Sequence, residues 1–156
     1  MNDNLKPGNM ALRRGRVSLH GQIYLVTTTT LDRRPVFIDF YAGQAAAQSF
    51  EDKAVLADAQ LLAWVLMPDH FHGLVQLGEA IDLPNLMNRI KSASARRVNR
   101  VIGREGALWA RAYHDHALRR EEDLFQTARY IVANPVRAGL VKRVGDYPFL
   151  NAIWLP

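Results

Sequence analysis

Two apolar stretches on either side of a Met-Pro-Asp break constrain the fold of this chain more than any other feature. Residues 60–67 form an almost continuous apolar run, and residues 71–77 alternate after the break. A short continuous run is typical of a strand that is buried on both faces, and Pro68 ends it. The two stretches therefore predict an antiparallel hairpin at the centre of a β-sheet.

Further patterns place helices and strands around this hairpin. A β-branched run follows Gln22, Asp39 is a candidate helix cap, and Asp82 with Pro84 begins another helix. The expected elements are strands at 22–30, 60–67, 71–77 and 109–118, and helices at 39–57, 82–102 and 121–134. This order predicts an α+β, ferredoxin-like (RRM-like) fold: a four-stranded antiparallel sheet with two backing helices, plus a C-terminal helix that carries Tyr130.

Composition limits the chemistry and the partners. The 156-residue chain has no cysteine, which excludes disulfide bonds and thiolate metal ligands. Its longest apolar run, residues 61–67, is far shorter than the roughly 20 residues of a membrane helix. No apolar secretory signal follows the basic N-terminus, so we expect a cytoplasmic protein with no membrane contact. The net charge of +5 suits a polyanion, although many small soluble domains are basic.

Basic residues gather in two places that suit DNA phosphates. One is an N-terminal arm over residues 1–16, and the other is the helix at 82–102. The alternative readings are a frayed terminus and a solvated helix face. The candidate DNA-binding residues are Arg13, Arg14, Arg16, Arg89, Lys91, Arg96 and Arg100.

His70 and His72 lie at the start of the third expected strand. Side chains alternate across a strand, so both imidazoles point to one face and Phe71 points to the other. Two imidazoles on one face can converge on a divalent metal. Two ligands alone do not define a site, and most His-x-His sequences are structural.

A second His-x-His lies in the fourth expected strand. It is His114-Asp115-His116, with an acidic residue at its centre in place of a hydrophobic one. Asp115 and His116 are candidates for a second layer behind the metal ligands or for DNA contacts, with ordinary polar strand positions as the alternative.

Tyr130 and Asn134 are four residues apart on the last expected helix and share a flank of its buried stripe. A phenol and an amide oxygen could therefore face the same small volume. A tyrosine at the edge of the core is the alternative for Tyr130. Because Asn134 precedes Pro135, its side chain could instead cap the helix end.

Four segments together resemble a known family. They are VLMPDHFHGLV, NRIKSASARRVNR, GALWARAYHDHALRREED and ARYIVANPVRAGLV. In this order and spacing they are similar to the REP-associated tyrosine transposases, within the single-tyrosine HUH transposases (His, hydrophobic, His). The resemblance covers about residues 16–145 and implies the same ferredoxin-like core. We expect a basic arm at 1–16, a transposase-like catalytic domain at 17–145 and a tail at 146–156.

The resemblance also implies residue roles. His70, His72 and Asn134 match the family's ligands for a divalent metal, Mg²⁺ or Mn²⁺, and Tyr130 matches its nucleophile. The implied reaction is cleavage and transfer of single-stranded DNA at hairpin-forming repeats, through a covalent 5′-phosphotyrosine.

Three alternatives to this function stay open. The chain could be a domesticated protein that binds hairpin DNA without cutting it, or a metal-dependent hydrolase that uses water in place of Tyr130. An RNA-binding module is the third, and it would stack bases on Tyr24 and Phe71. We expect a monomer, with a dimer that exchanges the tyrosine helix left open.

Overall fold

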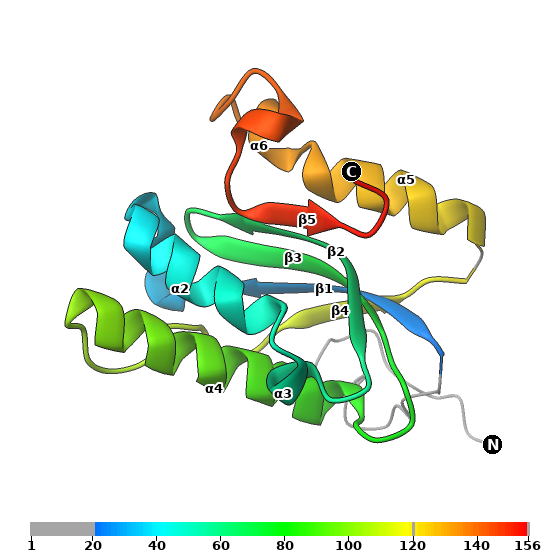
Figure 1. Cartoon of the computed structure of the whole chain (residues 1–156), viewed down its shortest axis with the longest axis horizontal. Coiled ribbons are helices and arrows are strands. Elements are labelled where there is room, and N and C mark those ends of the chain that lie inside the picture. The colour runs from blue at the N-terminus through cyan, green and yellow to red at the C-terminus, as the bar shows by residue number, and fades with distance from the viewer. Residues whose placement is uncertain (1–20, 120, 156) are drawn as a thin grey trace.

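The computed structural model describes residues 21–119 and 121–155 (Figure 1). The strands are β1 (Ile23–Thr29), β2 (Gln60–Met67), β3 (His70–Gln76), β4 (His114–Ala117) and β5 (Leu150–Ala152). They form one antiparallel sheet in the order β4-β1-β3-β2-β5, whose first four members have the ferredoxin-like order. The predicted fold class is therefore confirmed. The arm with Arg13, Arg14 and Arg16 lies outside the described residues.

The sheet has five strands where four were predicted, because the C-terminal segment adds an edge strand. β5 pairs with residues 63–65 of β2, and the hydroxyl of Tyr147 donates a 2.6 Å hydrogen bond to the carbonyl of Leu66. Burial raises the pKa of Tyr147 to about 12, so the phenol keeps the proton that it donates. A strand of three residues is too short to show a periodic pattern in the sequence.

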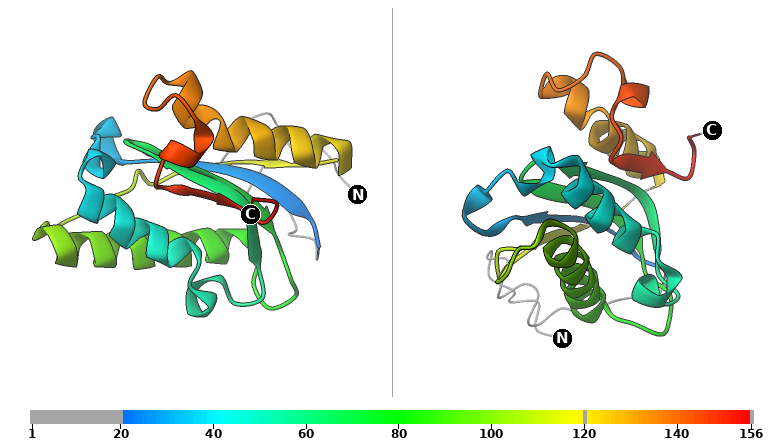
Figure 2. Two further views of the ribbon diagram at one scale, coloured as in Figure 1. Left: turned by 45° about the horizontal axis from the view of Figure 1, so that its top comes forward. Right: turned by 60° about the vertical axis from the view of Figure 1, so that its left-hand side comes forward.

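Helices cover both faces of the sheet (Figures 1 and 2). One face carries α2 (Phe40–Phe50), α3 (Lys53–Leu56) and α4 (Leu83–Ile102), and the other carries α5 (Glu121–Val132), followed by α6 (Asn134–Arg137). Short 3-10 helices are η1 (Leu31–Arg33), η2 (Val36–Ile38) and η3 (Val144–Asp146). None of the helices in the described part of the chain has the length and apolar character that crossing a membrane requires.

Side-chain caps set the helix boundaries. Asp39 and Asp82 each accept hydrogen bonds from N–H groups of the first turn, so α2 and α4 begin where predicted. The helix predicted at 39–57 is divided in two, because the chain leaves the helical conformation at Glu51 and Asp52 caps α3.

Each face of the sheet has its own core. The larger core lies under α2 and α4, and the smaller one lies under α5 and includes Leu62, Val65, Leu74, Ala128 and Ile131. Tyr24 and Phe71 belong to the larger core and are 2% and 0% exposed. They are therefore unavailable for base stacking, which overturns the RNA-binding alternative.

Gly43 allows Phe149 to pack against the backbone of α2. A Cβ added at Gly43 would lie 2.3 Å from Cε2 of Phe149, which is buried beneath the helix. Alanine normally stabilises a helix interior relative to glycine by about 1 kcal/mol, but overpacking a core costs about 1–3 kcal/mol. We expect Gly43→Ala to lower the free energy of unfolding, as measured by urea denaturation.

Gly145 provides the control for this prediction. A Cβ added there meets no atom within 4 Å, so Gly145→Ala should leave the free energy of unfolding unchanged or raise it slightly. A Gly43→Ala protein that is as stable as wild type would contradict the predicted clash with Phe149.

Candidate active site

His70 and His72 lie on the α5 face of the sheet, at the end of β3 nearest the β2–β3 turn. Their ring centroids are 4.7 Å apart, and the ring planes are inclined at 81°. Phe71, between them in sequence, is buried on the opposite face, where its ring centroid lies 4.4 Å from that of Phe50. The alternation predicted from the sequence therefore sets both imidazoles on one surface.

Thr27 of β1 fixes the orientation of His72. The two residues are directly paired across the sheet, and Oγ1 of Thr27 lies 2.8 Å from Nδ1 of His72. In the tautomer whose Nδ1–H donates to Oγ1 of Thr27, the lone pair of Nε2 is the one that can bind a metal.

Asp69 fixes the orientation of the His70 ring in the same way. Its Oδ1 lies 2.7 Å from Nδ1 of His70, and its Oδ2 lies 3.2 Å from Nε of Arg33. Arg33 and Asp32 both adopt left-handed backbone conformations, with φ of 55° and 58°. Such conformations are strained for residues other than glycine. The turn therefore stores strain while it directs Arg33 back toward Asp69.

The donor atoms at this surface suit a divalent metal. With Nδ1 of both histidines occupied by protein partners, each ring has Nε2 left to bind a metal. The predicted third ligand, Asn134, is half-buried at the start of α6, the helix that follows α5. Within the described ranges, no three His, Asp or Glu side chains gather around one point. A metal held here would therefore complete its coordination with oxygen atoms from other sources, such as DNA phosphate or water.

The charge state of His72 favours the form that binds metal. Burial lowers the pKa of His72 to about 4, and His70, Arg137 and Arg33 shift it in the same direction. The imidazole is therefore neutral at physiological pH, so a metal ion need not displace a proton.

Tyr130 lies on α5 with 60% of its surface exposed. The guanidinium carbon of Arg137 is 3.7 Å from the centroid of its ring. In one continuous helix the two residues would be about 10 Å apart along the axis. The two residues lie on either side of the break between α5 and α6, and Pro135 of α6 is buried. Arg137 was not predicted from the sequence, where its only signal is the seven-residue spacing from Tyr130.

The second His-x-His lies on β4 at the edge of the sheet. Cross-strand pairing places His114 opposite Thr27, and His116 shares this face, whereas Asp115 points toward the opposite face. His114 thus extends the row formed by Thr27 and His72, whereas the two residues predicted from the sequence, Asp115 and His116, lie opposite Val26 and Leu25. The register between β1 and β4 carries this information, and the sequence alone does not give it.

The arginines of α4 lie on the other side of the sheet from the histidines. A hollow of about 600 Å³ lies between α3 and α4. Three arginines that were predicted to bind DNA line it, namely Arg89, Arg96 and Arg100, and Arg97 lines it as well. Arg97 also forms an ion pair with Asp52. Lys91 is not in this hollow, and its Nζ donates hydrogen bonds of 2.6 and 3.0 Å to the backbone carbonyls of residues 110 and 111.

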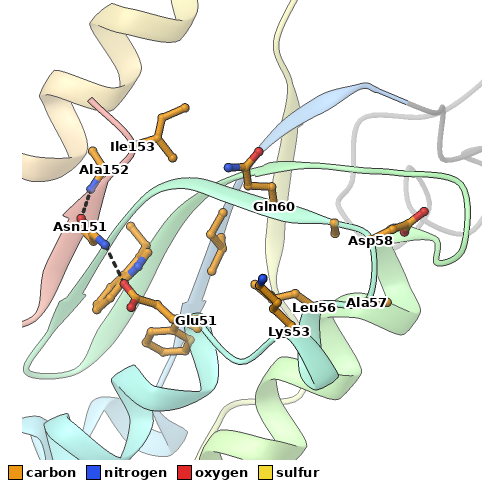
Figure 3. Close-up of a pocket in the computed structure, with 13 residues that line it drawn as sticks. Glu51, Lys53, Leu56, Ala57, Asp58, Gln60, Asn151, Ala152 and Ile153 are labelled. Carbon is orange, nitrogen blue, oxygen red and sulfur yellow. Dashed lines mark hydrogen bonds between the residues drawn. The ribbon is translucent and has the colours of Figure 1, made fainter. Parts of the chain in front are cut away.

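Another hollow, of about 400 Å³, lies at the far end of β2 (Figure 3). Gln60, Lys53 and Glu51 line it, and Nδ2 of Asn151 donates a 2.7 Å hydrogen bond to Glu51 at its rim. Seven residues along β2 separate Gln60 from Met67, about 23 Å, and Met67 pairs with His70. This hollow is therefore not part of the histidine site.

Comparisons with known proteins agree on one family. The family model described as "Transposase IS200 like" matches residues 18–134. A candidate REP-associated tyrosine transposase of Haemophilus influenzae is 28% identical over 139 residues, which are 83% of this chain and 78% of that protein. The REP-associated tyrosine transposase of Escherichia coli is 31% identical over 90 residues, 58% of this chain and 52% of that protein.

Solved structures show the same likeness. A REP-associated tyrosine transposase bound to a REP hairpin has a TM-score of 0.66 and 26% identity, with 86% of this chain and 79% of that chain covered. A candidate transposase of Deinococcus radiodurans has a TM-score of 0.54 and 26% identity, with 75% of this chain and 93% of that chain covered.

The lowered pKa of His72 predicts a loss of stability in mild acid for the metal-free protein. The pKa is 6.5 in the unfolded chain and about 4 in the folded one, so the unfolded chain binds the proton first. The stabilisation is complete above about pH 6.5, and it is lost as the pH falls toward 4, by about 3 kcal/mol in total.

The measurement compares wild type with His72→Gln in the presence of a chelator, by urea denaturation from about pH 7 to about pH 4. We expect the stability of wild type to decrease relative to that of the variant as the pH falls. A difference that stays constant across this range would show that His72 titrates normally.

Proposed function

The chain belongs to the IS200-like transposase family, and we propose that it is a metal-dependent endonuclease and strand transferase for single-stranded DNA at hairpin-forming repeats. The observation that carries this proposal is the placement of the Tyr130 helix on the sheet face that presents His70 and His72. The relative solved with a REP hairpin supports hairpin DNA as the partner.

His70, His72 and Asn134 would hold the divalent metal, Mg²⁺ or Mn²⁺. When bound, such an ion supplies Lewis acidity to the scissile phosphate. The protein's own contribution is orientation, because Thr27 and Asp69 each bind Nδ1 of one imidazole. Partners of this kind keep Nε2 directed at a ligand and raise the affinity of the site.

Tyr130 is the nucleophile of the proposed reaction. Its phenolic oxygen forms a bond to phosphorus while the bond from phosphorus to the 3′ oxygen breaks. The phenolic proton leaves to solvent, and the departing 3′ oxygen takes up a proton. The products are a 5′-phosphotyrosine and a free 3′-hydroxyl. One phosphate ester replaces another, so attack by a 3′-hydroxyl can reverse the step and join strands without an external energy source.

We assign the arginine hollow of α4 to the phosphates of the hairpin stem. Four guanidinium groups line it, and Asp52 is the single acidic side chain among its lining residues. Contacts of this kind bind a polyanion largely without regard to sequence, and each one releases counterions. Lys91 and Arg89 both donate hydrogen bonds to backbone carbonyls, Lys91 to those of residues 110 and 111 and Arg89 to that of Ala54, which makes them weaker candidates for DNA contact than Arg96 and Arg100.

Salt dependence tests the α4 hollow. In the double variant Arg96→Ala/Arg100→Ala, we expect weaker hairpin binding and a plot of log affinity against log salt whose slope is smaller by about 2, one unit for each lost contact. Arg143→Ala is the control, because Arg143 is exposed, pairs with Asp146 and lies outside this hollow. An unchanged slope in the double variant would remove the hollow from the DNA-binding surface.

Tyr130→Phe tests the nucleophile. A labelled hairpin oligonucleotide with a single-stranded flank is incubated with protein and Mn²⁺ or Mg²⁺, and DNA that stays attached after denaturation is counted. Wild type should form this adduct, and a chelator added before the DNA should prevent its formation, whereas Tyr130→Phe should bind the hairpin and form no adduct. A control reaction without metal measures the background.

The same assay separates the alternatives. Cleavage by Tyr130→Phe without any adduct would favour the hydrolase that uses water, and binding without cleavage by wild type would favour the domesticated binder. We propose that one chain contains the whole site, so a mixture of Tyr130→Phe and His70→Ala chains should stay inactive. Recovered cleavage in that mixture would show exchange of the tyrosine helix between two chains.

A further inference from the structure

We infer that Arg137 binds the scissile phosphate, holding a non-bridging oxygen with its guanidinium while its flat side fixes the ring of Tyr130. This inference rests on the proposed function. It assigns a role to a residue that lies beyond the segment matched by the family model, which ends at residue 134.

The stacking geometry leaves the hydrogen-bond donors of Arg137 available. Its guanidinium carbon lies 3.7 Å from the ring centroid of Tyr130, the distance of a face-on cation–π contact. A guanidinium stacked in this way uses its flat face, and its N–H groups remain at the edge, where they suit two oxygens of a phosphate. Across residues 21–119 and 121–155, no side chain or carbonyl accepts a hydrogen bond from it.

The stacked pair belongs to the layer that covers the histidine face of the sheet. α5 packs on this face, where Ile131, the residue after Tyr130, shares a buried cluster with Leu74, two residues after His72 on β3. Arg33, which lies beside the histidines through its contact with Asp69, has its charge compensated by that carboxylate. Of these two arginines, Arg137 is the one that forms no ion pair with a carboxylate of the described residues, and a phosphate between Tyr130 and the histidines would supply the missing anion.

The backbone holds Arg137 in this position. Pro135 is buried, and α6 is closed by hydrogen bonds from N–H of Arg137 to the carbonyl of Ala133, 3.0 Å, and from N–H of Ala138 to that of Asn134, 2.9 Å. Arg143 in the next turn offers a contrast, because its side chain is 82% exposed and pairs with Asp146. Arg143→Ala therefore removes one charge from the same segment without touching the site, and it serves as the matched control.

A binding cycle tests the phosphate contact without chemistry. Full-length Tyr130→Phe protein, with and without Arg137→Ala, is bound with Mn²⁺ to a hairpin oligonucleotide whose cleavage-site phosphate is natural or a neutral methylphosphonate. Arg137→Ala should weaken binding of the natural strand by about tenfold or more, as for other hydrogen bonds to charged groups. The methylphosphonate should bind the Tyr130→Phe protein more weakly than the natural strand does. In the protein that also carries Arg137→Ala, this loss of affinity should be several-fold smaller.

The rate of adduct formation supplies the second readout. In the chain that keeps Tyr130, Arg137→Ala should slow adduct formation by about 100-fold, Arg137→Lys should recover part of the rate, and Arg143→Ala should match wild type. Melting temperature should stay the same in all three variants and Mn²⁺ affinity should not fall in any of them, which separates a role at the phosphate from a structural one.

Two results would overturn the inference. One is an Arg137→Ala protein that forms the adduct within about threefold of the wild-type rate, and the other is an equal loss of affinity for the methylphosphonate with and without Arg137. If wild type forms no adduct, the proposed function fails, and the binding cycle alone decides whether Arg137 contacts the phosphate.

Discussion

The contact of Phe71 with Phe50 decides which face of β3 carries His70 and His72. Because side chains alternate along a strand, the burial of Phe71 under α2 also requires that both imidazoles point toward α5. A shift of one residue in the pairing of β1 with β3 would bury the imidazoles in the larger core and expose Phe71. Burial of the apolar Phe71 side chain on one face of the sheet therefore sets the position of the two imidazoles on the other face.

Polar contacts then set the orientation of each ring, and they come from outside the hairpin. Thr27 belongs to β1, and Asp69 is supported by Arg33 from the left-handed turn that follows β1. The backbone of Asp69 is tied to the same region, since its carbonyl accepts hydrogen bonds from N–H and Oγ1 of Thr30. The strain in the turn is thus offset by contacts that orient one imidazole.

The elements that could be predicted from the sequence are those whose formation depends on residues close together in the chain. The β2–β3 hairpin and α4 were predictable because an apolar run and a capping aspartate act within a few residues. β5 was missed because its three residues become a strand only through pairing with β2. Arg137 was missed because its contact with Tyr130 depends on the break after α5. His114 was missed because strand register is a long-range property. The roles proposed for Tyr130 and Asn134 come from the family resemblance, because spacing alone left them open.

The two cores of unequal size give the layers of this protein unequal local stability. α5 is held by the smaller cluster, so its amide hydrogens should exchange with solvent sooner than those of β1, β3 and α4. The proposed nucleophile, Tyr130, therefore belongs to the layer that is expected to open at the lower free energy. If a DNA end is attached to Tyr130 as proposed, partial release of α5 would carry that end away from the histidines while the sheet keeps its shape. A tethered strand could in this way exchange partners without unfolding the domain.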